Sequence, residues 1–221
     1  GDPDNVELLI SASKLYGAYA SVFVEDRGRQ KRLSTISFDY AHHAFCVYKQ
    51  AACNIRELSY YEFEQSLKQF NKEDVQVLFA LGSAWAGWLQ ANSADWNAVA
   101  ELPRIDAIIQ RVLELDPAIN NGDAYLYMAV MQSFLPPAMG GKPELAKTNF
   151  EQAIKVSNGS NLMAKLLYAE KYARLVFDKE LHDKLLQEVI DSRIENDEMT
   201  LINSIAQHKA KRLLAQSDEY F

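Results

Sequence analysis

The clearest structural signal in the chain is the stretch Pro143-Glu144-Leu145-Ala146-Lys147-Thr148-Asn149-Phe150-Glu151-Gln152-Ala153-Ile154-Lys155-Val156. Ala146, Phe150 and Ala153 are spaced by four and three residues, so a helix would place them on one face. Pro143 at the first position and Glu144 in the first turn are typical of a helix N-terminus. Because two small residues flank an aromatic ring, we expect this helix to pack closely against a neighbour.

A similar pattern occurs earlier, as Ile105-x3-Ile109-x2-Val112 followed by the exit Leu-Glu-Leu-Asp-Pro over 113–117. This arrangement is typical of the second helix of a tetratricopeptide repeat. A plausible first helix precedes each copy, with small residues at Gly82 and Ala129 that would let the paired helices approach. A third, weaker unit follows over 161–191. Three stacked helix pairs would bury a continuous core and leave a concave face.

Apolar residues recur at helical spacing through most of the rest of the chain. The predicted helices span about 6–24, 30–56, 60–70, 74–90, 104–115, 123–134, 144–156, 161–177, 179–191 and 198–216. Proline and glycine clusters separate them, and no run of alternating β-branched residues lies between. We therefore expect an all-α fold: a single domain over 1–221, with N-terminal helices (4–72) packed against three degenerate tetratricopeptide-like hairpins (75–192) in a superhelical array, and a C-terminal capping helix (197–221).

Composition excludes several classes of protein. The chain has 221 residues, 48% of them hydrophobic and 24% charged, which predicts a globular protein rather than a disordered one. A net charge of −7 and the absence of a basic stripe disfavour a nucleic-acid partner. No apolar run is long enough to cross a bilayer, and the N-terminal sequence lacks the pattern of a signal peptide.

The cysteines and histidines do not indicate a metal or redox site. A continuous helix would separate Cys46 and Cys53 by a rise of about 10.5 Å, too far for a disulfide, so both are expected to stay free. His42 and His43 would point to different sides of their helix. His182 and His208 have no ligand partner at a metal-binding spacing such as HExxH. We therefore predict no bound metal.

Motifs for catalysis or phosphate binding are also missing. The segment 136–143 superficially resembles a phosphate loop, but Pro136 and Pro143 replace the required Gly and Ser or Thr. It fits a helix-to-helix connection better. The sequence contains neither a G-x-S-x-G nucleophile elbow nor a recognisable pair of catalytic acids. We predict no catalytic residue, no cofactor and no enzymatic activity.

The inner positions of the predicted repeats are the best candidates for a binding surface. In this repeat class the first helix of each pair lines the concave face. The proposed ligand or partner face consists of Phe79, Ser83, Ala86, Leu126, Val130, Met163 and Leu166, and the remaining inner positions are Gln76, Asp123, Ser133, Glu170 and Ala173. Without Lys or Arg, this face is poorly suited to a peptide carboxylate and fits an apolar ligand or partner. Several of these residues would instead be core if the repeat register slips by one.

Several stretches also resemble one known family nearly end to end. They are Tyr-Gly at 16–17, Val-Phe-Val-Glu-Asp at 22–26, Ala-Trp-Ala at 84–86, Ala-Glu-Leu-Pro-Arg-Ile at 100–105, Leu-Glu-Leu-Asp-Pro at 113–117, Gly-Gly-Lys-Pro-Glu-Leu-Ala-Lys at 140–147, Asn-Leu-Met-Ala-Lys at 161–165, Tyr-Ala-Arg-Leu-Val-Phe-Asp at 172–178 and Leu-Leu-Ala at 213–215. The chain resembles the TatT family, the T component of tripartite ATP-independent periplasmic (TRAP) transporters.

This resemblance implies a function. It suggests a periplasmic lipoprotein of tetratricopeptide-like hairpins that self-associates, with a trimer as the expected form, and binds the extracytoplasmic substrate-binding subunit of its transporter. Hydrophobic organic acids are the ligands that the family suggests. Membrane attachment is expected only through an N-terminal lipid anchor that the sequence does not include. The alternative is a generic peptide-binding or assembly module of the bacterial cell envelope.

Overall fold

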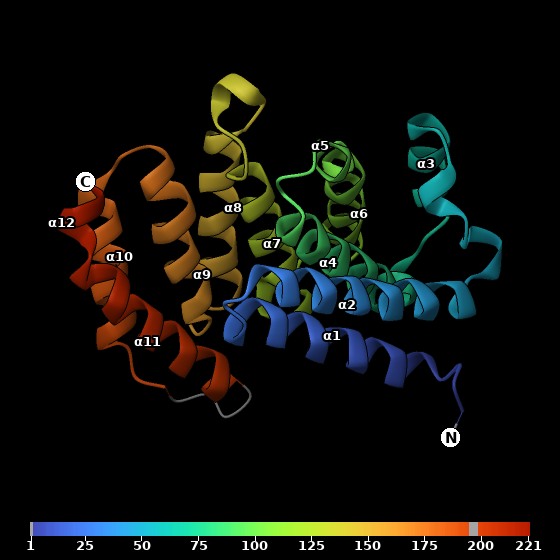
Figure 1. Ribbon diagram of the computed structural model, residues 1–221, viewed down its shortest axis with the longest axis horizontal. Helices are drawn as coiled ribbons and strands as arrows, with labels where there is room; N and C mark the ends of the chain where they lie inside the picture. Colours follow the sequence, from blue (N-terminus) through green and yellow to red (C-terminus); the bar gives the residue numbers. More distant parts are fainter. Residues whose placement is uncertain (1, 195–198) are drawn as a thin grey trace. The chain divides into compact units, whose positions relative to one another are not determined.

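The computed structural model describes residues 2–194 and 199–221, and its regular elements are helices (Figure 1). No strand occurs among these described residues, which confirms the predicted all-α fold. The chain forms two compact units, unit 1 ending at Asp116 and unit 2 beginning at Pro117. The predictions of a single domain and of a superhelical array stay predictions.

Unit 1 is built around a very apolar helix, α4. Its elements are α1 (Val6–Phe23), α2 (Arg27–Tyr48), η1 (Gln50–Ala52), η2 (Ile55–Glu57), α3 (Tyr60–Leu67), η3 (Lys72–Asp74), α4 (Val75–Ala91), α5 (Trp96–Val99) and α6 (Leu102–Leu115). Helices α1 and α2 form a hairpin, and α4 packs against α1, α2 and α6. Because α4 is apolar on almost all sides, it is buried for most of its length, with Trp85 completely inaccessible.

The contact between α4 and α6 depends on a glycine. A Cβ atom at Gly82 would lie 2.7 Å from Cγ2 of Ile108 and 2.9 Å from Cδ1 of Ile109. Both isoleucines are completely buried, so a larger residue would force the two helices apart. The prediction that Gly82 permits the close approach of this helix pair is confirmed.

Unit 2 continues with helices that pack on their neighbours in sequence. Its elements are η4 (Ile119–Gly122), α7 (Asp123–Gln132), η5 (Pro137–Met139), α8 (Pro143–Val156), α9 (Leu162–Leu167), the π-helical η6 (Tyr168–Ala173), α10 (Lys179–Asp191), α11 (Thr200–Ala215) and α12 (Ser217–Tyr220). Helix α7 packs against α8, α10 packs against α9, η6 and α11, and α11 also contacts α9.

The motif of small and aromatic residues on α8 lies at the centre of unit 2. Ala146, Phe150 and Ala153 are all completely buried, and the helix begins at Pro143 as predicted. The Phe150 ring stacks on Tyr168 of η6, with ring centroids 5.1 Å apart and planes within 13°. The predicted structural role of Phe150 is therefore supported by its burial and by a specific ring contact.

Helix boundaries differ from the prediction most clearly after Tyr48. The helix predicted over 30–56 is wrong beyond this point, because α2 ends at Tyr48 and η1 turns the chain back. The Lys49 ammonium ion-pairs with the buried carboxylate of Asp74 at 3.2 Å and lies 4.3 Å from the centroid of the Phe70 ring. A continued helix would redirect this side chain and leave the buried charge of Asp74 without its partner.

Smaller differences occur elsewhere. The short helices α5 and α12 were not predicted, and the helix expected over 161–177 divides into α9 and η6. Positions 197 and 198, which the predicted capping helix includes, lie outside the described residues. Each predicted helix pair is nevertheless in contact: α4 with α6, α7 with α8, and α9 and η6 with α10.

Candidate functional site

The predicted concave-face residues are distributed over both units. Phe79, Ser83 and Ala86 lie on α4 in unit 1, whereas Leu126 and Val130 lie on α7, and Met163 and Leu166 on α9, in unit 2. Phe79, Ala86, Leu126 and Leu166 are buried, and the other three are half-buried.

The four residues in unit 2 come together around one apolar core. Leu126 and Leu166 are buried members of the core that contains Phe150, and Val130 and Met163 pack against its edge. The buried pair therefore contributes mainly to packing. Val130 and Met163 keep apolar surface that a ligand or partner can contact, so they are the functional candidates within unit 2.

A second cluster, centred on Arg56 of η2, joins four elements of unit 1. The guanidinium donates two hydrogen bonds to the Glu101 carboxylate, from Nη2 to Oε1 at 2.6 Å and from Nε to Oε2 at 3.1 Å. Trp85 Nε1 donates to the same Oε2 at 2.7 Å. The guanidinium carbon also lies 4.9–5.6 Å from the ring centroids of Phe38, Trp85 and Trp88. We call these five residues the Arg56 cluster.

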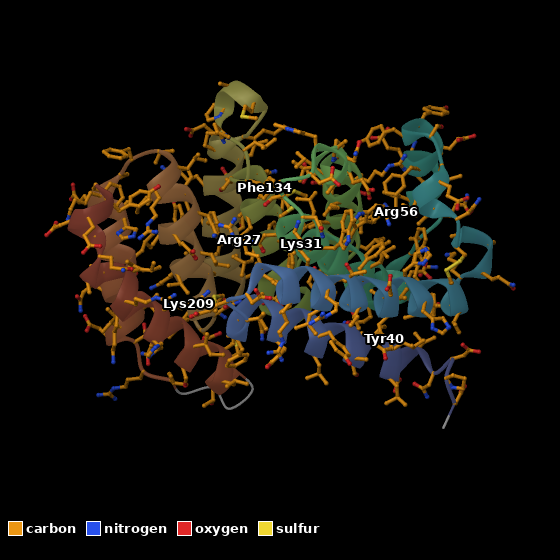
Figure 2. All side chains as sticks on the ribbon, viewed as in Figure 1. Arg27, Lys31, Tyr40, Arg56, Phe134 and Lys209 are labelled. Atoms are coloured by element: carbon orange, nitrogen blue, oxygen red, sulfur yellow. A yellow bond between two sulfur atoms is a disulfide. The ribbon has the colours of Figure 1, made fainter. Side chains whose placement is uncertain are left out.

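Burial decides what the Arg56 cluster contributes. The side chain of Arg56, labelled in Figure 2, is 38% exposed and that of Glu101 is 22% exposed, so the ion pair lies at the surface of the apolar packing. Bidentate pairing and cation–π contacts both favour one fixed orientation of the guanidinium. The cluster therefore holds η2 rigidly against α2, α4 and the start of α6.

Two further arginines of α6 hold the segment between η2 and α4. Arg104 Nη2 donates to the carbonyl oxygen of Leu58 at 2.5 Å, and its guanidinium carbon lies 5.0 Å from the centroid of the Phe63 ring. Arg111 Nη2 donates to the carbonyl oxygen of Phe70 at 2.7 Å. These contacts satisfy carbonyl groups that lie just before and just after α3.

In unit 2, the main titratable cluster surrounds His182, which is completely buried. Arg174 Nε donates to His182 Nε2 at 3.3 Å, so the imidazole proton is on Nδ1 and is donated to Asp183 Oδ1 at 2.8 Å. Burial by itself would raise the pKa of Asp183, but hydrogen bonds from Lys179, Ser217 and His182 outweigh it and lower the pKa to about 2. These bonds tie α10 to the residues after α11.

The two cysteines are close together, contrary to the sequence prediction. Cys46 and Cys53 form a disulfide with their Cα atoms 4.5 Å apart, so the expectation that both stay free is wrong. That expectation assumed a continuous helix, and the turn after Tyr48 removes the separation. His42 lies beside them, with both ring nitrogens 3.8 Å from Cys46 Sγ.

Comparison with known proteins assigns the chain to a family. The family model described as the TRAP transporter T-component, TAtT, matches residues 1–221. The chain belongs to this family. No curated protein matches the chain.

This T-component is thus an extracytoplasmic component associated with a TRAP transporter system, and the family resemblance in its sequence is confirmed. Within the described residues, no helix is long and apolar enough to cross a membrane. Two of the stretches that carried the resemblance meet in unit 1, where Trp85 and Glu101 share a hydrogen bond. A third stretch, 172–178, supplies Arg174, which donates a hydrogen bond to His182 in unit 2.

Sequence reasoning missed Arg56 and the grouping of His42 with the cysteines. Arg56 was the last residue of the helix predicted over 30–56, so nothing marked it as a partner of Glu101, 45 positions later. The spacing His42-x3-Cys46 was a usable signal, because residues four apart lie on one helix face. Only the position of Cys53 required the tertiary structure.

Proposed function

We propose that this T-component is a non-enzymatic periplasmic scaffold that binds the extracytoplasmic substrate-binding subunit of its TRAP transporter. The observation that carries the proposal is the match of the T-component family model to the whole chain. A lipid anchor on the native precursor would hold the protein at a membrane. Helical hairpins are suited to this role because their side chains form extended surfaces on rigid elements.

We also propose that the apolar inner face contributes a ligand site. Its candidate residues include no lysine or arginine, which favours an apolar chain over a peptide carboxylate. Val130 and Met163 would contact the ligand, while the buried Leu126 and Leu166 support them from the core. A hydrophobic organic acid is the ligand class that the family resemblance suggests; its apolar part would contact this face, and its carboxylate would stay in solvent.

Self-association is the third part of the proposal, with a trimer as the expected form. The chain contains 11 Tyr and 3 Trp, residue types that are enriched at protein interfaces. Some of them are strongly exposed, including Tyr61 at 71% and Trp96 at 69%. These side chains support an assembly of several copies.

Purified protein provides the test of docking and assembly. Size-exclusion chromatography with light scattering, run with and without the substrate-binding subunit encoded beside the same transporter, should show an oligomer that shifts to a larger complex. A strict monomer at micromolar concentrations would contradict self-association. A folded protein that does not bind the subunit would contradict the scaffold function and favour a general assembly module of the cell envelope.

The ligand face is tested with a fluorescent fatty-acid probe and the variant Val130→Lys. A charge at this half-buried position should weaken probe binding about tenfold or more, because an apolar ligand cannot solvate the ammonium group. Leu145→Lys is the matched control, since Leu145 on α8 is 51% exposed and should tolerate the charge. Unchanged probe binding in folded Val130→Lys would show that apolar ligands do not use this face.

A further inference from the structure

The side chains of His42, Cys46 and Cys53 form a compact group of metal-ligand atoms at the C-terminal end of α2. One potential ligand atom from each residue lies within 4.8 Å of the other two. His42 and Cys46 come from successive turns of α2, and η1 brings Cys53 back beside them. All three side chains are half-buried, so the group is partly shielded but accessible from solvent.

The orientation of His42 suits a metal ligand. Its Nε2 lies 3.0 Å from the carbonyl oxygen of Cys53, an arrangement in which Nε2 donates its proton and Nδ1 keeps a lone pair. Metal-binding histidines commonly donate their second ring nitrogen to a carbonyl in this way. The ring also stacks on Phe38, with centroids 6.0 Å apart, which restricts its rotation.

The distance from His42 Nδ1 to the thiol sulfur is also compatible with a shared zinc ion. Zinc binds nitrogen at about 2.0–2.1 Å and sulfur at about 2.3 Å, so a tetrahedral angle separates the two ligand atoms by about 3.6 Å. Nδ1 lies 3.8 Å from Cys46 Sγ, close to this value. Because Nε2 is equally far from Sγ, the sulfur must turn towards the Nδ1 lone pair after reduction in order to share the ion. In the disulfide, however, the two sulfur atoms are bonded to each other and cannot both ligate a metal.

We infer that His42, Cys46 and Cys53 form a zinc site when the disulfide is reduced. A dithiol reductant of the thioredoxin class breaks the S–S bond by supplying two electrons and two protons, and is itself oxidised to a disulfide. Zn²⁺ then displaces the two thiol protons and forms two Zn–S bonds and one Zn–N bond. Water completes the tetrahedron, and the two thiolates neutralise the charge of the ion.

Either cross-link would hold the same part of unit 1. The residues after Cys53 include η2, which carries Arg56 into its cluster, and Phe38 contacts both His42 and Arg56. Zinc in the reduced protein would thus replace the covalent constraint that the disulfide supplies in the oxidised protein.

The test uses the full chain, reduced with a phosphine and desalted without oxygen. Titration with Co²⁺ as a spectroscopic probe should produce thiolate-to-cobalt charge-transfer absorption that saturates near one ion per chain, and Zn²⁺ should abolish it by displacement. About two protons should be released per zinc ion, and zinc should protect both thiols from alkylation. The oxidised protein should bind neither ion at this site. A reduced protein without these cobalt bands would overturn the inference.

The adjacent histidines provide a matched pair of variants. His42→Ala should weaken zinc binding about tenfold or more, whereas His43→Ala should bind like the wild type, because His43 instead contacts Asp4 at 2.9 Å. Cys53→Ser should abolish the cobalt bands. If that variant fails to fold, alkylation of the wild-type thiols, followed by mass spectrometry with and without zinc, decides the cysteine contribution. Equal zinc affinity in His42→Ala and the wild type would refute the site.

Discussion

Removing the Glu101 carboxylate should destabilise unit 1 substantially. In Glu101→Ala, the Nε1–H group of the completely buried Trp85 loses its acceptor, which costs about 1–3 kcal/mol. The Arg56 side chain is 38% exposed and can recover hydration, so loss of the ion pair adds at most about 1 kcal/mol. We therefore expect the free energy of unfolding to fall by about 1–4 kcal/mol.

The assay is urea unfolding followed by tryptophan fluorescence. All three tryptophans, Trp85, Trp88 and Trp96, belong to unit 1, so this signal reports on that unit alone. A loss of about 3 kcal/mol should lower the urea midpoint by about 1 M or more.

Two further variants separate the hydrogen bond from the loss of charge. Glu101→Gln keeps an oxygen that can accept from Trp85 and should cost only about 1 kcal/mol. Glu114→Ala removes a half-exposed partner of Arg111 and should change stability by less than about 0.5 kcal/mol. If Glu101→Ala unfolds at the wild-type midpoint, or if Glu101→Gln is as unstable as Glu101→Ala, the role assigned to the carboxylate is incorrect.

Two predictions concern unit 2, which contains no tryptophan; its unfolding is measured by circular dichroism, to which the helices of both units contribute. Phe150→Ala should lower the free energy of unfolding by about 3–5 kcal/mol, because it leaves a cavity beside Tyr168. Leu145→Ala, at an exposed position, should have little effect. An unchanged melting temperature for Phe150→Ala would refute the inferred packing. The lowered pKa of Asp183, about 2 against an ordinary 3.8, contributes about 2 kcal/mol of stability that is complete above about pH 4 and is lost as the pH falls towards 2. Asp183→Asn should remove this part of the acid dependence. If the stability of the variant and of the wild type falls in parallel as the pH is lowered, the contribution assigned to Asp183 is excluded.

Local patterns were sufficient to predict the parts of the fold in which neighbours in sequence are neighbours in space. The spacing of Ala146, Phe150 and Ala153 predicted a buried helix face, and Gly82 predicted a close helix contact. Both predictions succeeded because helical periodicity fixes which side chains share a face.

The candidate site was less predictable, because helical periodicity identifies the residues that share a face but not what covers that face. Periodicity selected Leu126, Val130, Met163 and Leu166 as inner residues, but it did not distinguish core positions from accessible ones. That distinction depends on which elements cover each side chain. Here Leu126 and Leu166 belong to a core to which α8, η6, α10 and α11 also contribute residues, and no local pattern contains that information.

The sequence by itself determined the helical class, the pairing of successive helices and the membership of the T-component family. Only the tertiary structure decided where α2 ends, because Lys49 turns away from the helix to pair with the buried carboxylate of Asp74, 25 positions later. That turn brings Cys53 back to Cys46 and His42, and places Arg56 against Glu101. Helical periodicity is set by hydrogen bonds four residues apart, whereas the pairing of a buried charge depends on partners that only the folded chain brings together.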